Sequence, residues 1–296
     1  TRPTVPQLQH YRAATSILSI NTTSCLKTTA NGVTRLKRLL DYAHPHHYDV
    51  ICVQETAASN RRIREAIASA GHEDNYKGSY VKFNNEAGSR GMLTLVKTSL
   101  HYIEHPTRNK IALQVVEIPQ QGATPSCIIV NTYINTTSAA VRSDILREIG
   151  EIRVKFAHRN IIICGDYNMT PSQVQQQLIN PVNALGKGHL KNNLSRRYTF
   201  TQGKAKSKID HMVQSLEPSL QSHYNIVPKG YIAGITTNHR VITLQIGDKT
   251  TLSRTVDRPP PPPPAETTFP QVPGHHFDWE PMKKLIPLLG RSTTHR

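Results

Sequence analysis

The sequence predicts an α/β domain in which packed β-sheets are flanked by helices. Continuous apolar runs typical of buried strands recur along the middle of the chain, at residues 50–53, 127–133 and 161–164 among others. Some runs follow one another too closely for a crossover helix, whereas others are separated by stretches with helical spacing. A doubly wound parallel sheet would need a stricter alternation. We therefore expect mixed sheets with helices packed on them.

Two periodicities predict the individual elements, because buried strands are continuously apolar and helices repeat apolar residues every three or four positions. Strands are expected at residues 17–20, 50–53, 92–96, 111–118, 127–133, 161–164, 211–213 and 241–246. Helices are expected at residues 33–43, 61–70 and 138–157. The last of these helices should bury one face formed by Val141, Ile145, Ile149, Ile152 and Phe156.

Composition divides the chain into three parts. Residues 1–14 are poor in apolar side chains and are expected to form an N-terminal tail, whereas residues 15–248 can bury a core. Six consecutive prolines at residues 259–264 must adopt extended polyproline II geometry, so residues 249–296 are interpreted as a proline-rich linker. An apolar patch within residues 277–289 is expected to dock on a downstream domain.

Charge and cysteine content narrow the class of partner. Lys and Arg number 36 against 20 Asp and Glu, a formal net charge of +16, which favours binding to nucleic acid. A membrane partner is not expected, since the sequence offers neither a basic amphipathic helix nor a lipidation signal. Four scattered cysteines form neither a disulfide framework nor a zinc site, which suits an intracellular protein with reduced thiols.

Polar side chains stand where several expected strands end. Taken alone, each has a plain structural explanation: a Glu after a strand is usually a solvated charge, and Gly-Asp-Tyr-Asn at 165–168 is typical of a turn. Together they indicate a site, because strand ends gather at one edge of a sheet. The residues are Asn21, Gln54, Glu55, Tyr133, Asp166, Asn168, Asp210, Asn238 and His239.

The order of these motifs resembles that of the endonuclease/exonuclease/phosphatase superfamily. The matching pieces are Ile20-Asn21, Gln54-Glu55, Asn131-Thr132-Tyr133, Gly165-Asp166-Tyr167-Asn168, Ser207-Lys208-Ile209-Asp210 and Thr237-Asn238-His239. The stretch Tyr198-Thr199-Phe200-Thr201-Gln202-Gly203 and the proline-rich exit look most like the endonuclease of LINE-type, non-LTR retrotransposons. The resemblance implies a four-layered α/β sandwich, with two packed mixed β-sheets flanked by helices.

The resemblance also implies a role for each residue of the site. Glu55 would hold Mg²⁺, which Mn²⁺ could replace, and Asn21 would help to place the metal or the phosphate. Asp166 would orient or deprotonate the attacking water, while Asp210 would fix the tautomer and charge of His239. The side chains expected to contact the phosphate are those of Tyr133, Asn168, Asn238 and His239.

The implied activity is a nick in double-stranded DNA that leaves a 3′-hydroxyl and a 5′-phosphate. In a LINE-type retrotransposon this nick primes target-primed reverse transcription. The implied partners are therefore DNA and a downstream reverse transcriptase domain of the same polyprotein, and the implied location is nuclear or intracellular. Arg61, Arg62 and Arg64, with Lys204, Lys206 and Lys208, flank the expected site and suit a DNA backbone, although ordinary solvation explains them equally well.

Three positions depart from the superfamily pattern and leave other interpretations open. Asn238 stands where an Asp usually precedes the late His, Thr23 replaces an acidic or amide residue, and residues 134–136 replace an apolar-Pro-Asn sequence. A catalytically weakened copy that serves as a DNA-binding module is one alternative. A phosphodiesterase of the same superfamily that acts on RNA or phospholipid is another.

Overall fold

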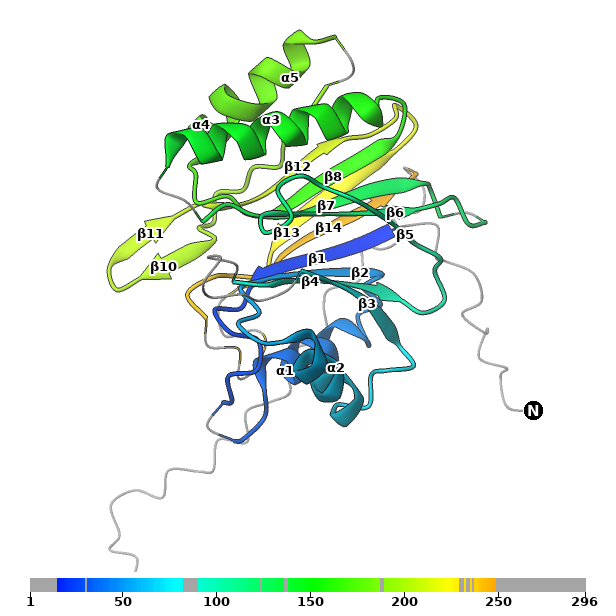
Figure 1. Ribbon diagram of the computed structural model, residues 1–296, viewed down its shortest axis with the longest axis vertical. Coiled ribbons are helices and arrows are strands. Elements are labelled where there is room, and N and C mark those ends of the chain that lie inside the picture. The colour runs from blue at the N-terminus through cyan, green and yellow to red at the C-terminus, as the bar shows by residue number, and fades with distance from the viewer. Residues whose placement is uncertain are drawn as a thin grey trace, which may run out of the picture. The chain divides into compact units, whose positions relative to one another are not determined.

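Two six-stranded sheets pack face to face, and helices cover their outer faces (Figure 1). The computed structural model describes residues 15–29, 31–81, 90–122, 124–135, 138–186, 189–228, 232, 235 and 237–248. In spatial order the first sheet contains β13 (Gln221–Ile226), β14 (Ile242–Gly247), β1 (Thr15–Asn21), β2 (Val50–Gln54), β4 (Met92–Lys97) and β3 (Tyr76–Val81). The second contains β5 (Ile103–His105), β6 (Leu113–Ile118), β7 (Cys127–Tyr133), β8 (Asn160–Asp166), β12 (Asp210–Ser215) and β9 (Lys191–Asn192).

Both sheets are mixed. The neighbours β1 and β2 are parallel in the first sheet, and β7 and β8 are parallel in the second. The other paired strands of the two sheets run antiparallel. A separate two-stranded hairpin, β10 (Phe200–Gln202) and β11 (Ala205–Ser207), stands out at one edge of the sandwich in Figure 1.

Helices form the two outer layers. The first sheet is covered by α1 (Arg35–Ala43) and α2 (Asn60–Ser69), and the second by α3 (Ala139–Lys155) with a short helical segment beside it (Figure 1). That segment contains α4 (Pro171–Val174), the π-helix η1 (Gln175–Ile179) and α5 (Asn180–Ala184). At the end of η1 the backbone N–H of Asn180 donates to the carbonyl of Gln175, five residues earlier, and the next residue, Pro181, has no N–H to donate.

Three apolar cores fill the spaces between the four layers. Alternate residues of each central strand point to opposite faces, so that Ile129 lies between the sheets while Ile128 and Val130 face α3. The core between the sheets holds Ile17, Val50, Cys52, Val96, Val116, Ile118, Cys127, Ile129, Ile162, Cys164, Met212, Ile226, Ile242, Leu244 and Ile246. The predicted four-layered sandwich is confirmed.

Most predicted elements are present, and the differences have local reasons. The strand expected from residue 111 begins at Leu113, because Ile111 lies in a preceding turn and is 48% exposed. On α3, Val141 is also 48% exposed, so its predicted place on the buried face is wrong; the buried stretch of α3 begins at Ile145. Strands β3 and β13 were not expected: both lie at sheet edges, and β13 is largely polar.

Other expectations concern the cysteines and the chain ends. All four cysteines are unbonded, as predicted, and all four are buried. Among the described residues, no helix is both long and apolar enough to cross a membrane. The predicted tail at residues 1–14 and the linker at residues 249–296 lie outside the described residues, and those boundaries stay predictions.

Candidate active site

Several central strands of both sheets end at one edge of the sandwich (Figure 1), and predicted polar residues stand at these strand ends. Asn21 ends β1 and Glu55 follows β2 in the first sheet. Tyr133 ends β7 and Asp166 ends β8 in the second, and Asp210 begins the antiparallel β12. The parallel pairs bring two carboxyl ends together within each sheet, and face-to-face packing brings the two sheets' ends to one place.

Gly165 holds Asp166 in register with its neighbours. In the ladder, Thr132 pairs with Gly165 and Tyr133 pairs with Asp166. The φ angle of Gly165 is +146°, and a Cβ at this position would come within 1.9 Å of the Thr132 carbonyl oxygen. Only glycine allows the backbone at residue 165 to lie this close to Thr132, which explains why the Gly-Asp-Tyr-Asn segment begins with glycine.

Glu55 occupies a left-handed backbone conformation, with φ of 51°. Such a conformation costs a non-glycine residue roughly 1–2 kcal/mol, so neighbouring contacts must hold it. The Glu55 carbonyl accepts from the Ser24 N–H at 2.8 Å, and the next residue, Thr56, donates its N–H to the Gly91 carbonyl at 3.1 Å. The main chain thereby turns Glu55 out of β2 and toward the site.

Side chains from the two sheets meet through Asn21 and Tyr133. One amide nitrogen, Asn21 Nδ2, donates to Glu55 Oε1 at 3.0 Å and to Asp166 Oδ2 at 2.9 Å. The Tyr133 hydroxyl donates to Glu55 Oε1 at 2.6 Å. Burial, followed by the hydrogen bond to Glu55, raises the pKa of Tyr133, which keeps this hydroxyl protonated and donating.

His239 is held between two carboxylates. Its Nδ1 lies 2.9 Å from Asp210 Oδ1, and its Nε2 lies 3.9 Å from Asp166 Oδ2. Burial alone would lower the pKa of His239, but the charge and hydrogen bond of Asp210, with the charge of Asp166, outweigh it and raise the pKa. Burial, followed by the charge of Asp210, raises the pKa of Asp166 to about 7. A carboxyl group with a pKa near neutrality suits proton transfer at physiological pH.

The donor set fits a hard divalent cation. Glu55 is half-buried and offers a carboxylate close to that of Asp166, since both accept from the same Asn21 nitrogen. Among the described residues, ligand atoms of Asp166, Asp210 and His239 also lie within 4.8 Å of one another. Several convergent carboxylate oxygens are the chemistry that Mg²⁺ and Mn²⁺ prefer.

Asn21 contacts the carboxylates of the site through its amide nitrogen, and its expected help in placing the metal stays a prediction. Its Oδ1 accepts from the Thr23 N–H at 2.9 Å, while its nitrogen faces the carboxylates. In this orientation the amide nitrogen of Asn21 orients Glu55 and Asp166. Tyr133 likewise donates to Glu55 here, and its expected donation to a phosphate stays a prediction.

Two further predicted residues lie at the exposed rim. Asn168, in a left-handed conformation with φ of 49°, donates its backbone N–H to Asp166 Oδ1 at 2.9 Å. Its amide nitrogen donates to the Ile134 carbonyl at 3.1 Å and keeps a second N–H for a ligand. Asn238 is exposed, and its backbone carbonyl accepts from Thr201. The structure therefore places six of the nine predicted residues in the cluster and two at its rim, whereas Gln54 is buried and bonded to Asn131.

Threonines that the sequence did not single out hold this arrangement together. The hydroxyl of Thr199 accepts from the backbone N–H groups of Ile209 and Asp210 at 3.0 and 3.1 Å. The hydroxyl of Thr237 donates to the Asn21 carbonyl at 3.0 Å and accepts from the His239 N–H at 3.2 Å. Thr199 and Thr237 both belong to the sequence motifs quoted above, so their place in these motifs could have indicated their role.

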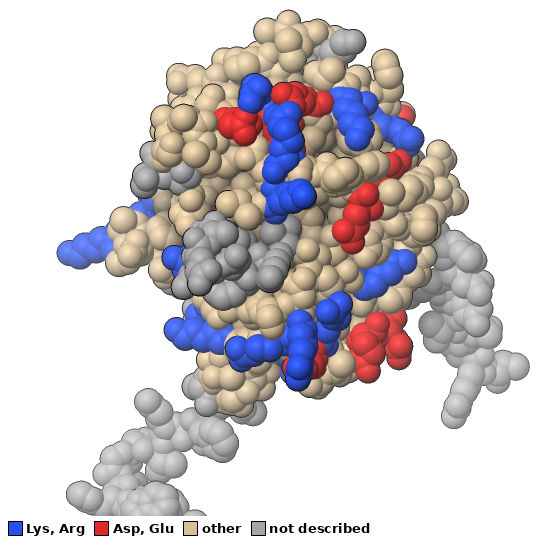
Figure 2. Space-filling view, viewed as in Figure 1, with Lys and Arg blue, Asp and Glu red and all other residues tan. Residues whose placement is uncertain are grey.

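The β10–β11 hairpin is joined directly to the catalytic His candidate. Phe200 forms an isolated β-bridge with His239, and their ring centroids are 4.8 Å apart. Lys204 and Lys206 are exposed on the hairpin, and the Lys206 amine lies 5.8 Å from the centroid of the exposed Tyr198 ring. Figure 2 shows basic side chains at the hairpin tip and over α2, which carries three exposed arginines.

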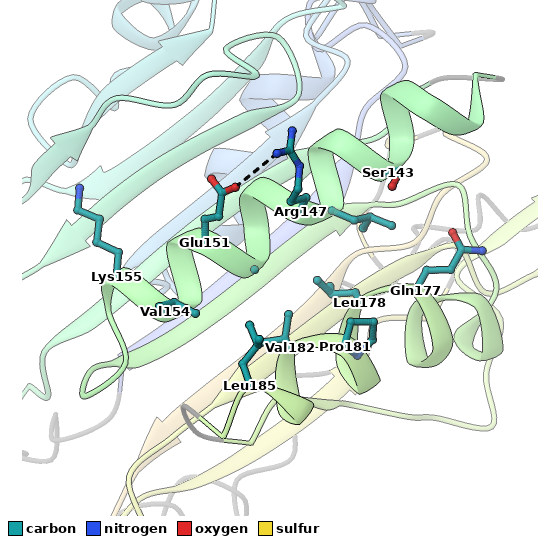
Figure 3. Close-up of a pocket in the computed structure, with 12 residues that line it drawn as sticks. Ser143, Arg147, Glu151, Val154, Lys155, Gln177, Leu178, Pro181, Val182 and Leu185 are labelled. Carbon is teal, nitrogen blue, oxygen red and sulfur yellow. Dashed lines mark ion pairs between the residues drawn. The ribbon is translucent and has the colours of Figure 1, made fainter.

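A cavity lies between helices, away from this site. It has a volume of about 880 Å³ and separates α3 from η1 and α5 on the outer side of the second sheet (Figure 3). Leu146, Leu178 and Val182 line it, and Arg147 and Glu151 stand at its rim. None of the predicted site residues lines this cavity.

Comparison with known proteins agrees with this geometry. The sequence profile of the Endonuclease/Exonuclease/phosphatase family matches residues 18–230. Among curated proteins, none matches the sequence. The solved endonuclease domain of TRAS1, a telomere-specific non-LTR retrotransposon, shares 14% identity at a TM-score of 0.55, over 79% of this chain and 98% of its own.

Two other solved structures are similar. The AP endonuclease LMAP from Leishmania major shares 13% identity at a TM-score of 0.59, over 79% of this chain and 88% of its own. The D. rerio TDP2 complexed with a single-strand DNA product shares 15% identity at a TM-score of 0.56, over 79% of this chain and 98% of its own. At these identities the likeness shows the fold. The resemblance predicted from the motif order is confirmed.

Proposed function

Because the chain belongs to the endonuclease/exonuclease/phosphatase family, we propose that it is a magnesium-dependent endonuclease that nicks double-stranded DNA. Membership of this family makes the chain a metal-dependent phosphodiesterase. The observation that carries the finer proposal is the joining of the Asp166–Asp210–His239 cluster to a projecting basic hairpin. A hydrolytic centre and an exposed cationic arm beside it suit a large polyanionic substrate.

The chemistry follows from the groups at the site. When Mg²⁺ is bound, Glu55 would be its carboxylate ligand, and the ion would supply Lewis-acid stabilisation of the phosphate. Asp166 takes a proton from the attacking water, for which its raised pKa suits it. His239, kept protonated by Asp210, donates from Nε2 to a non-bridging oxygen. The free N–H of Asn168 reaches the same phosphate from the rim.

The proposal includes the biological setting implied by the motifs. The nick leaves a 3′-hydroxyl that primes target-primed reverse transcription. The proposed partner is a reverse transcriptase domain downstream in the same polyprotein. The nucleus is then the place of action. The structural likeness to a retrotransposon endonuclease domain supports this setting.

Supercoiled plasmid tests the proposed activity directly. Incubation with Mg²⁺ should convert it to the open-circular form, and EDTA should prevent the conversion. Sealing of the product by DNA ligase would show a 3′-hydroxyl beside a 5′-phosphate. Cleavage of an RNA substrate or of sphingomyelin with no nicking of plasmid would favour the other phosphodiesterases of the family.

Charge removal on the hairpin is expected to weaken DNA binding without disturbing the fold. Lys204→Ala/Lys206→Ala removes two exposed cations. In a plot of the logarithm of the DNA association constant against the logarithm of salt concentration, the line should become less steep. The slope should fall by about 0.9 for each phosphate that the hairpin no longer neutralises. The matched control is Lys155→Ala/Lys191→Ala, which removes two exposed cations from α3 and from the edge strand β9. Equal slopes for the two variants would show that the hairpin lysines do not contact the DNA backbone.

Asn238 favours a second candidate, a catalytically weakened copy that only binds DNA. If the enzyme is active but short of negative charge near the metal, Asn238→Asp should lower the Mg²⁺ concentration for half-maximal nicking. A gain of about 1.4 kcal/mol would lower that midpoint roughly tenfold. An unchanged midpoint would show that this position does not contact the metal. DNA binding with no nicking by either protein would establish the binding-only copy.

A further inference from the structure

A line of buried polar side chains crosses the apolar space between the two sheets. The surrounding core is formed by residues such as Cys52, Val116 and Ile129. The polar residues come from β1, β2, β3 and β4 of the first sheet and from β6 and β7 of the second. They are Ser19, Gln54, Ser79, Thr94, Gln114 and Asn131, each no more than 6% exposed.

Their hydrogen bonds form one continuous chain between the sheets. Gln54 Nε2 donates to Ser19 Oγ at 3.1 Å and to Asn131 Oδ1 at 2.7 Å. Asn131 Nδ2 in turn donates to Thr94 Oγ1 at 3.1 Å, and Thr94 Oγ1 donates to Gln114 Oε1 at 2.6 Å. At the far end, Gln114 Nε2 donates to Ser79 Oγ at 2.6 Å.

Stability alone does not account for such a line. Amides lose their hydration when they are buried, and apolar side chains of similar volume are often as good for stability. Hydrogen bonds between the inner faces of the two sheets fix one relative position of the sheets, whereas apolar contacts alone would allow several. A defined placement matters most where groups from both sheets must act together.

The active-site end of the line lies next to the catalytic cluster. Gln54 immediately precedes Glu55, and Asn131 lies two positions before Tyr133, on the same face of β7. The bond between Gln54 and Asn131 thus runs beside the 2.6 Å bond from Tyr133 to Glu55. One bond joins the strands, and the other joins the functional groups at their ends.

We propose that Gln54 and Asn131 are positioning residues, which fix Glu55 of the first sheet against Tyr133 and Asp166 of the second. They do not touch the substrate; they set the separation of the groups that do. The inference rests on the proposed phosphodiester hydrolysis. Catalytic geometry must be held within about 0.5 Å, which makes a small slide of the sheets costly for turnover.

The test compares two double variants. Gln54→Met/Asn131→Leu removes the bond beside the site and leaves Thr94, Gln114 and Ser79 bonded to one another. The control, Ser79→Ala/Gln114→Met, removes the bonds of Gln114 to Ser79, to Thr94 and, at 3.5 Å, to Asn131. Asn131 keeps its bonds to Gln54 and Thr94 in this control. The measurements are kcat and KM on a DNA duplex, the melting temperature, and a crystal structure of each variant.

The first variant should lose at least tenfold in kcat with KM changed less than twofold, and its melting temperature should stay near the parent's. The control should keep both constants within twofold. An unchanged kcat in the first variant, or an equal loss in the control, would overturn the inference. If the first variant does not fold, Gln54→Asn shortens the amide by one methylene group and tests the same bond.

The crystal structures separate this inference from the proposed function. If the parent cleaves no DNA, the proposed function fails, but the hydrogen bond from the Tyr133 hydroxyl to Glu55 Oε1 still reports on positioning. A break in that bond only in Gln54→Met/Asn131→Leu would support the inference. Its retention in that variant, or its absence from the control as well, would overturn it.

Discussion

Glu55→Ala and Asp166→Ala are each expected to lower Mg²⁺-dependent nicking by roughly 10³-fold or more. The first removes the expected carboxylate ligand of the cation, and the second removes the group that takes a proton from water. Both side chains lie at strand ends and not in an apolar core, so the fold should persist. Nicking of supercoiled plasmid, measured as initial rates with circular dichroism of each variant, checks this result.

A matched substitution separates the site from general loss of negative charge. Glu65→Ala removes an exposed carboxylate of α2 whose side chain is 57% exposed and pairs with Arg61. Exposed pairs of this kind contribute at most about 1 kcal/mol, so its nicking rate should stay near that of the parent. If Glu55→Ala and Asp166→Ala nicked plasmid as fast as Glu65→Ala, the assignment of the site would be wrong.

Asp210→Asn is expected to lower kcat by roughly 10²-fold or more while leaving DNA affinity nearly unchanged. Asp210 accepts from Nδ1 of His239, which leaves Nε2 to face the phosphate. An amide keeps the volume but loses the charge that stabilises the protonated imidazole. Without the charge of Asp210, less would offset the lowering of the His239 pKa by burial, and this pKa should fall.

The pH profile gives this variant a signature of its own. In the parent, the raised pKa keeps His239 protonated to higher pH, so activity that needs the charged ring persists there. In Asp210→Asn the alkaline limb of the kcat/KM profile should move to lower pH. A uniform fall in kcat at every pH would mean that Asp210 does not control the charge of His239.

The residues with the largest expected losses come from both sheets of the sandwich. Glu55 belongs to the first sheet, whereas Asp166 and Asp210 are paired neighbours in the second. Asn21 bridges the sheets with one nitrogen, and Tyr133 makes a second bridge. Activity should therefore depend on how the sheets are held together as well as on the catalytic groups themselves.

The sequence by itself determined the central strands and the family. Continuous apolar runs identify β2, β7 and β8, because strands buried on both faces leave no polar alternation. The motif order predicted which residues lie close together, since strand ends meet at one edge of a sheet. Edge strands escaped prediction, because β13 exposes alternate polar side chains and owes its conformation to pairing with β14.

Only the tertiary structure decided how the site residues act on one another. Local sequence does not specify that Asn21 offers its nitrogen to Glu55 and Asp166, because both hydrogen bonds join residues distant along the chain. The bond between Gln54 and Asn131 spans 77 positions and likewise depends on the packing of two sheets. Apolar patterning selects which face of each strand is buried. Side-chain shape and hydrogen bonding between the packed sheets then select the one arrangement that assembles the site.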